Sequence, residues 1–221
     1  MAKQLPIVRI VDDDESFCLS QKLFLQAMGW FVQTYSSAKA FLENDYVEQP
    51  GCLILDVRMP EMTGLELQEA MIVREVPLPI IFLTGHGDVN MAVHALQHGA
   101  FDFLQKPVDP EKLHEVVSRA VEHSLALCEQ SQDAARIRQV YDTLTPREQD
   151  VVKLAAMDKS NKEIGDTLCI SLPTVKMHRS NAFLKLGVKG ALEAYWLLET
   201  ISVVEKGGRP ASALPFVPQK G

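Results

Sequence analysis

The chain has 221 residues, 47% of them hydrophobic, so it can build one large or two ordinary domains with packed cores and is neither disordered nor fibrous. The formal charge of −7 is unevenly distributed, because residues 1–125 carry a net −9 and residues 141–221 a net +2. This asymmetry predicts two modules with different partners.

Two further features concern the environment of the protein. No apolar run approaches the ~20 residues of a membrane span, and residues 1–10 lack the apolar stretch of a secretion signal, so we expect a cytoplasmic protein with no membrane partner. The four cysteines lie far apart and form no CxxC pair. We therefore expect reduced thiols rather than disulfides or a zinc cluster.

The first 125 residues alternate short apolar or β-branched runs with helical patterns. This alternation predicts an α/β domain, a doubly wound parallel sheet of five strands with helices on both faces. The third and fourth runs are apolar at consecutive positions, as expected for central strands buried on both faces. Arg9 does not fit the pattern of the first run. The expected strands are residues 7–11, 30–35, 52–55, 80–84 and 102–105.

A helical pattern continues beyond the last expected strand. From Pro110 an apolar repeat runs to about residue 125, and the sequence then turns polar. We interpret this stretch as the last helix of a first domain, residues 1–125, followed by a helical linker, residues 126–140.

A small all-α domain of four helices is predicted over residues 141–206. Two capping boxes mark its first two helices, and Gly187 is a good left-handed stop for the third. Residues 207–221 contain several glycines and prolines and are expected to be a disordered tail. The helices are expected from about 146, from about 161, from after Ser171 to near Gly187, and from 191 to 200.

Polar residues follow several of the expected strands. Ligands of open parallel sheets bind beyond the carboxyl ends of the strands, so these residues are expected to surround one cavity. Converging carboxylates suit Mg²⁺, one carboxylate can attack phosphorus, and a hydroxyl and an ammonium can hold the phosphoryl oxygens. Taken singly, each residue is better explained as a solvated loop residue, but their joint placement at successive strand ends favours a common site. They are Asp12, Asp13 and Asp14 after the first strand, Asp56 after the third, Thr84 after the fourth and Lys106 after the fifth.

The same positions belong to four motifs, which are Val-Asp-Asp at 11–13, Leu-Asp-Val-Arg-Met-Pro at 55–60, Thr84-Gly85 and Lys106-Pro107. In order and spacing they resemble the receiver domain of two-component response regulators. The resemblance covers residues 5 to about 123 and implies a flavodoxin-like receiver fold.

The resemblance also implies roles for individual residues. Asp56 is expected to accept a phosphoryl group from a phosphohistidine on a sensor histidine kinase, with Thr84 and Lys106 assisting. The expected Mg²⁺ ligands are Asp13, Asp56 and the main-chain carbonyl of Arg58, with Asp12 helping through water.

A conformational switch is implied as well, formed by Thr84 and Phe103. Phe103 falls where the family has an aromatic side chain whose rotamer reports phosphorylation, and its alternative role is packing between a strand and a helix. The Lys106-Pro107 peptide is expected to be cis. From their positions two residues after Asp56 and Thr84, we also expect Arg58 and His86 to control the access of water to the phosphoaspartate, although a loop histidine needs no such role.

In the second domain, two helices joined by a short turn predict a helix-turn-helix. On the second of these helices, Val175, Ala182 and Leu186 share one side, which must pack inward. Residues on the other side can read base edges in the major groove, and others can contact phosphates. A charged outer face is often only solvated, and a net +2 is a modest electrostatic footprint. The expected base readers are Lys176, Met177, Ser180 and Asn181, and the expected phosphate contacts are Thr174, Arg179, Lys185 and Lys162.

Three motifs in this domain are Leu-Thr-Pro-Arg-Glu at 144–148, Asn-Lys-Glu-Ile at 161–164 and Lys-Leu-Gly-Val at 185–188. They resemble the LuxR-type helix-turn-helix of NarL/FixJ-like response regulators, over about residues 141–200. Two positions depart from that family. Asp158 stands where a helix-ending glycine is common, and Gly165 stands where alanine is common, at some cost in helix propensity.

We therefore expect a phosphorylation-controlled transcriptional regulator, not an enzyme, that forms a homodimer on phosphorylation. Its expected partners are a sensor histidine kinase and promoter DNA, with RNA polymerase as a further candidate. One alternative is a phosphatase that turns over on its aspartyl phosphate, but this needs a second carboxylate two residues after the nucleophile, where the chain has Arg58. Another is a DNA-binding protein with a phosphate-independent receiver, which should lack an acidic-site residue.

Overall fold

The computed structural model describes residues 5–47, 49–85 and 89–205. It contains two compact units, and the boundary between them in the sequence falls after Cys128. In the ranges just given, no helix is long and apolar enough to cross a membrane. Of the four cysteines, Cys18 and Cys52 are buried, Cys128 is half-buried and Cys169 is exposed.

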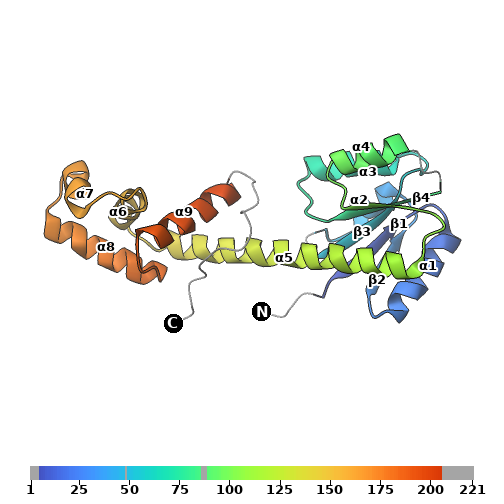
Figure 1. Cartoon of the computed structure of the whole chain (residues 1–221), viewed down its shortest axis with the longest axis horizontal. Helices are drawn as coiled ribbons and strands as arrows, with labels where there is room; N and C mark the ends of the chain where they lie inside the picture. Colours follow the sequence, from blue (N-terminus) through green and yellow to red (C-terminus); the bar gives the residue numbers. More distant parts are fainter. Residues whose placement is uncertain (1–4, 48, 86–88, 206–221) are drawn as a thin grey trace. The chain divides into compact units, whose positions relative to one another are not determined.

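The first unit is built on a sheet of five strands, which are β1 (Ile7–Val11), β2 (Phe31–Tyr35), β3 (Gly51–Asp56), β4 (Ile80–Thr84) and β5 (Asp102–Gln105). All neighbouring strands are parallel, and their order is β2-β1-β3-β4-β5 (Figure 1). The order reverses at β1, which confirms the predicted doubly wound fold. β2 begins one residue later than predicted and β3 is longer at both ends, as expected for boundaries inferred from sequence alone.

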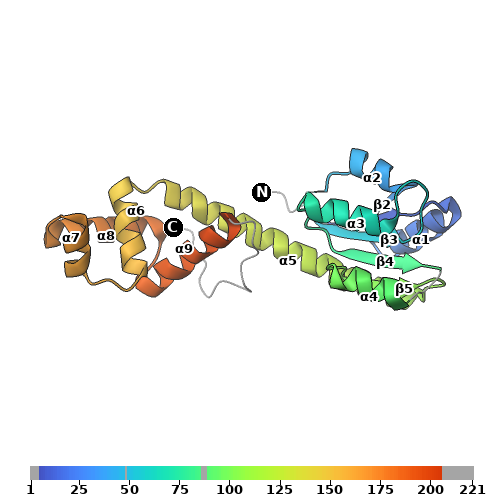
Figure 2. The ribbon, with the colours of Figure 1, turned by 90° about the horizontal axis from the view of Figure 1, so that it is seen from above.

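Helices cover both faces of this sheet, and they are α1 (Glu15–Ala27), α2 (Ala38–Asn44), α3 (Gly64–Val73), α4 (Val89–Gln97) and α5 (Pro110–Asp142). α1 and the first part of α5 pack on one face around Leu25 and Leu113. α2, α3 and α4 pack on the other face around Phe41, Leu67 and Ala95 (Figures 1 and 2). β3 and β4 are buried at every position, as predicted for central strands.

Arg9, which does not fit the apolar pattern of β1, is completely buried. Its Nε donates to both carboxylate oxygens of Asp45, at 2.8 and 2.9 Å, and its other nitrogens donate to the main-chain oxygens of Ile7 and Tyr46. The Tyr35 hydroxyl also donates to Asp45. A charge is tolerated inside a protein only when it is paired and hydrogen-bonded, and this network meets that condition.

Replacing Asp45 by alanine should destabilise the first unit by about 3–5 kcal/mol, because the Arg9 guanidinium would stay buried without its anion. Urea unfolding of the full chain in a Trp196→Phe background, followed by Trp30 fluorescence, measures the change. The double variant Arg9→Met, Asp45→Leu removes both charges and should be more stable than Asp45→Ala. An Asp45→Ala protein as stable as its parent would contradict this account.

The second unit contains the last part of α5 and four further helices, α6 (Pro146–Ala156), α7 (Asn161–Leu168), α8 (Leu172–Leu186) and α9 (Ala191–Glu205) (Figure 2). All four begin where the sequence predicts, and α9 runs five residues further than expected. Residues 126–140, predicted as a helical linker, are continuous with α5, and Ile137 and Tyr141 pack in the core of the second unit. The predicted disordered tail, residues 207–221, lies outside the described residues.

Helix caps explain the boundaries in the second unit. The side chains of Thr145 and Ser160 each accept the N–H three residues ahead, while Glu148 and Glu163 accept the N–H of the capping residue. These are the two predicted capping boxes. α8 ends at Gly187, whose φ of 66° is left-handed, as predicted.

Candidate functional sites

The acidic site lies at the carboxyl ends of β1, β3 and β5. Asp12 follows β1 and Asp56 ends β3, and both residues are buried. Lys106 follows β5, and its ammonium donates to Asp12 Oδ2 and, at 2.9 Å, to Asp56 Oδ1. One cation therefore joins carboxylates from two neighbouring strands.

The remaining carboxylate oxygens accept main-chain N–H groups. Asp12 Oδ1 accepts the N–H of Asp14 at 3.0 Å, and Asp56 Oδ2 accepts the N–H of Arg58 at 2.7 Å. The peptide between Lys106 and Pro107 is cis, as predicted. Both carboxylates are thus held at both oxygens, which fixes their orientation.

The electrostatics of the site follow from burial and pairing. Burial raises the pKa of Asp12 above its ordinary value, and the hydrogen bond from Lys106 offsets this only in part. Burial alone would lower the pKa of Lys106, but its hydrogen bonds to Asp12 and Asp56 raise that pKa above its ordinary value. Lys106 is therefore a permanent cation at neutral pH, placed to stabilise negative charge near Asp56.

The other residues predicted near the acidic site, which follow β1, β3 and β4, differ in their surroundings. Asp13 and Arg58 have exposed side chains. Asp14 is the N-cap of α1, where its carboxylate accepts the N–H of Phe17 at 3.0 Å. His86, predicted beside the path of water, lies outside the described residues.

The donor set of the acidic site suits a small hard cation. In the part of the chain that the structure describes, no three Asp, Glu, His or Cys side chains converge into a ready-made metal cage. Mg²⁺ does not need one, because it commonly binds one or two carboxylates together with water and phosphate oxygens. The buried carboxylates of Asp12 and Asp56, with Asp13 exposed beside them, fit that mode.

The two predicted switch residues lie on β4 and β5. Thr84 ends β4 and is 2% exposed, and its main-chain oxygen accepts the N–H of Lys106 at 2.8 Å. Phe103 is half-buried and packs with the apolar cluster on the face covered by α2, α3 and α4. Its ring centroid lies 6.4 Å from that of Phe82. This position is compatible with both predicted roles of Phe103, switching and packing.

Two residues that sequence patterns do not mark also shape the site. The ring of Phe17 lies 4.0 Å from the Lys106 ammonium, measured to the ring centroid, which is a cation–π contact. Gly64 begins α3, and a Cβ there would lie 2.1 Å from the main-chain oxygen of Asp56. The only sequence signal for Gly64 is a glycine at the start of a helix, whereas Phe17 looks like an ordinary core position.

Gly64→Ala should therefore displace the loop after β3, because the clash is with backbone rather than with a flexible side chain. We expect a loss of about 1–3 kcal/mol, typical of overpacking, measured by urea unfolding. Gly85→Ala is the matched control, since a Cβ there meets nothing within 4 Å and should change stability by no more than about 0.5 kcal/mol. Equal stability of the two variants would contradict the close approach.

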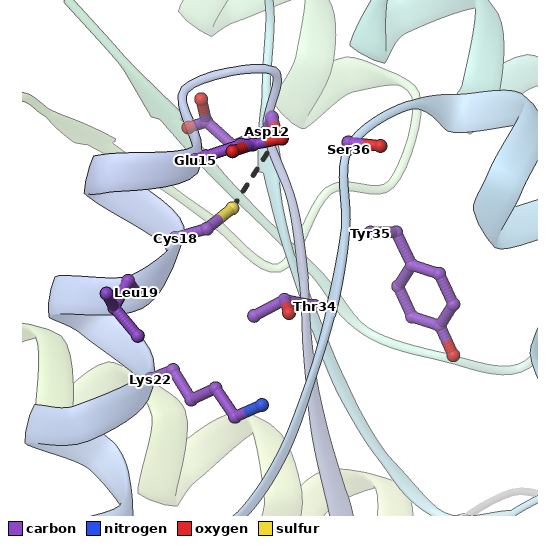
Figure 3. Close-up of a pocket in the computed structure, with 8 residues that line it drawn as sticks. All are labelled: Asp12, Glu15, Cys18, Leu19, Lys22, Thr34, Tyr35 and Ser36. Atoms are coloured by element: carbon purple, nitrogen blue, oxygen red, sulfur yellow. Dashed lines mark hydrogen bonds between the residues drawn. The ribbon is translucent and has the colours of Figure 1, made fainter.

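A groove of about 290 Å³ opens beside Asp12, between α1 and β2 (Figure 3). Cys18 and Lys22 project into it from α1, and the Cys18 thiol donates to the main-chain oxygen of Asp12 at 3.5 Å. Burial raises the pKa of Cys18 to about 11, so it is a neutral thiol. The ring of Tyr35 points away from α1. The groove is thus a polar approach to one edge of the acidic site.

The second candidate site consists of α7 and α8, joined by a tight turn. Cys169 ends α7 in the left-handed conformation, with a φ of 55°. Val175, Ala182 and Leu186 of α8 are buried, as the helical wheel predicts. Among the predicted DNA contacts, Thr174 is half-buried, and the exposed ones include Lys162, Lys176, Met177, Ser180 and Asn181.

Two side chains predicted to contact DNA phosphates also bond to other side chains of the same domain. Arg179 is half-buried and donates to Asn161 Oδ1 at 2.8 Å. Lys185 donates through its ammonium to Glu148 Oε2 at 2.7 Å. Each side chain thus makes one bond within the domain and carries further N–H donors.

The two departures from the LuxR-type pattern have different structural settings. Asp158 is left-handed, with a φ of 58°, which costs a non-glycine residue some stability. At Gly165 an added Cβ would lie 2.9 Å from the main-chain oxygen of Ile170. The glycine therefore allows a close approach between α7 and the turn, and its role is not limited to the expected cost in helix propensity.

Residues 8–118 match the family model of the response regulator receiver domain, and residues 142–198 match that of the luxR family of bacterial regulatory proteins. The chain belongs to the response regulator family. As in other members that join these two domains, it is a DNA-binding transcriptional regulator controlled by phosphorylation, which confirms the predicted family and fold.

Similar response regulators match over most of their length. The chain is 36% identical over 201 residues to response regulator protein TmoT of Ectopseudomonas mendocina, covering 91% of each protein. It is 39% identical over 182 residues to transcriptional regulatory protein FixJ of Rhizobium meliloti, covering 82% of this chain and 89% of FixJ. The solved structure of response regulator StyR has 37% identity and a TM-score of 0.74, and the match covers 91% of this chain and 99% of StyR.

Proposed function

We propose that Asp56 accepts a phosphoryl group from the phosphohistidine of a sensor histidine kinase, with Mg²⁺ as cofactor. The observation that carries the proposal is the placement of the Lys106 ammonium between the buried carboxylates of Asp12 and Asp56. In the transfer, an Asp56 oxygen forms a bond to phosphorus as the bond from phosphorus to the histidine nitrogen breaks.

Residues of this chain supply the nucleophile and the charge stabilisation. Lys106 offsets negative charge on the phosphoryl oxygens, and Thr84 at the end of β4 offers a hydroxyl on the neighbouring strand. Mg²⁺, when bound, screens the carboxylates from the incoming phosphoryl group. Its proposed ligands are Asp13, Asp56 and the main-chain oxygen of Arg58, with Asp12 acting through water.

Incubation with acetyl phosphate and Mg²⁺ should add one phosphoryl group to the intact chain, detected by mass spectrometry. Asp56→Asn should stay folded and unlabelled, and Asp13→Ala should lose Mg²⁺-dependent labelling because an exposed ligand is removed. Asp14→Asn is the matched control, since asparagine also caps helices and Asp14 is outside the proposed ligand set. Labelling in EDTA as strong as in Mg²⁺, or normal labelling of Asp13→Ala, would exclude the proposed site.

We further propose that phosphorylation promotes a homodimer through a change at Thr84 and Phe103. Residues 141–221 carry a net charge of only +2, so a single DNA-binding domain should bind weakly, whereas joining two such domains makes the second contact intramolecular. Because the proposed target is promoter DNA, we expect the protein to act in the cytoplasm, with RNA polymerase as a candidate partner.

We infer no enzymatic turnover, because Arg58 stands where a phosphatase of this kind needs a carboxylate.

DNA recognition is proposed to use the exposed face of α8 and the start of α7. Lys176→Ala should change the preferred sequence and cost about 1–3 kcal/mol at the affected base pair, measured by selecting duplexes from a randomised pool with the full-length protein. Lys153→Ala, which removes an exposed lysine of α6, is the control and should leave the preference unchanged. If Lys176→Ala selects the same sequences as the wild type, this face does not read bases. The proposed contacts are Lys162, Thr174, Lys176, Met177, Ser180 and Asn181.

A further inference from the structure

The last turn of α8 carries a lysine whose ammonium is directed at another helix of the same unit. Lys185 Nζ lies 2.7 Å from Oε2 of Glu148, in the first turn of α6. The Glu148 side chain is 5% exposed and that of Lys185 is 41% exposed. The ion pair therefore joins the end of α8 to the beginning of α6, and its anion is buried.

One carboxylate oxygen of Glu148 accepts hydrogen bonds both from the N-terminus of α6 and from α8. Besides the Lys185 ammonium, Oε2 accepts the main-chain N–H of Thr145 at 2.8 Å, which completes the capping box of α6. The hydrogen bonds from Lys185 and from Thr145 lower the pKa of Glu148, so it is a carboxylate at neutral pH. If Lys185 turned to a DNA phosphate, Glu148 would keep its cost of burial without its cation.

Helical geometry places Lys185 at the edge of the proposed reading face. At 3.6 residues per turn, its side chain lies about 180° around the helix from Lys176, at one edge of that face, and about 40° from Asn181, at the other edge. Lys176 is exposed, and Ser180, one turn further along, is exposed on the same side. Lys185 instead stands at the border of the buried side, where it meets α6.

The opposite border of the buried side is fixed in a similar way. Arg179 donates to Asn161 Oδ1, at the start of α7, and its guanidinium lies over the ring of Phe183, 5.1 Å from the centroid. α8 is thus tied to α7 near its middle and to α6 near its end. Two polar contacts at different heights restrict rotation of the helix more than one contact does.

We propose that Lys185 is a positioning residue, which fixes the orientation of α8 against α6 through Glu148 and makes no phosphate contact. This replaces the phosphate contact predicted for Lys185 from the sequence. The inference rests on the proposed DNA-binding function, whose contacts come from the exposed face of α8.

The salt dependence of DNA binding separates the two roles. Removing one phosphate contact should reduce the slope of log K against log salt by about 0.9, whereas removing a positioning interaction lowers affinity at every salt concentration and leaves the slope unchanged. The probe is the duplex that the full-length wild type selects from a randomised pool. The variants are Lys185→Met, Glu148→Gln and the double variant, with Lys185→Arg to restore the cation and Lys162→Ala as the phosphate-contact control.

We expect Lys185→Met and Glu148→Gln to weaken binding at least five-fold with wild-type slopes, and the double variant to be no weaker than the poorer single variant. Lys185→Arg should recover most of the affinity. Urea unfolding in a Trp30→Phe background, followed by Trp196, should show the same coupling between Lys185 and Glu148. This readout stays informative where a variant binds DNA too weakly to measure.

The proposal is overturned if the slope for Lys185→Met falls by about 0.9 while Glu148→Gln binds normally. It is also overturned if the effects of the two single substitutions simply add in the double variant. Failure of the underlying function gives a different result, because the wild type would then select no duplex at all, with Lys162→Ala indistinguishable from it.

Discussion

The receiver half of this protein depends on one buried electrostatic arrangement, two carboxylates that share a single ammonium at the carboxyl end of the sheet. Each of these groups would be costly to bury alone, so Asp12, Asp56 and Lys106 require one another. The ends of β1, β3 and β5 must therefore lie at the same level, which the register of these strands, with β4 between β3 and β5, provides. The ring of Phe17 and the missing side chain of Gly64 keep the surrounding loops close to these charges.

Much of this arrangement can be predicted from sequence, because it follows from topology. A parallel sheet brings the residues after its strands to one edge, so a carboxylate after the first strand and another after the third must meet. Gly64 and Arg9 show where such reasoning ends. The need for Gly64 comes from a 2.1 Å approach between two backbone segments, and Arg9 is acceptable in β1 only because Asp45, distant in sequence, supplies its anion. Neither distance is encoded in a local pattern.

In the second unit, sequence spacing predicts which residues of α8 are buried but not which partners its charged residues have. Helical periodicity correctly places Val175, Ala182 and Leu186 inside, since the angle around a helix depends only on spacing. It does not tell whether a charged residue at the border of the buried side is free for DNA or engaged by a neighbouring helix. Lys185 and Arg179 each bond to a neighbouring helix, Lys185 to Glu148 of α6 and Arg179 to Asn161 of α7. Charge on a recognition helix is therefore an incomplete guide to contact with DNA.

The rates at which Cys18 and Cys52 are chemically modified depend on how well the receiver domain shields them. Burial raises the pKa of Cys52 to about 12, and that of Cys18 to about 11, and only the thiolate reacts with alkylating reagents. Both thiols are therefore neutral in the folded protein, and because Cys52 is completely buried, its modification rate follows transient local unfolding. Cys18 lines the groove beside Asp12 and measures access to that groove, whereas Cys52 measures the opening of a central strand. The exposed Cys169 reacts without any opening, so its modification rate is an internal reference for the rates of Cys18 and Cys52.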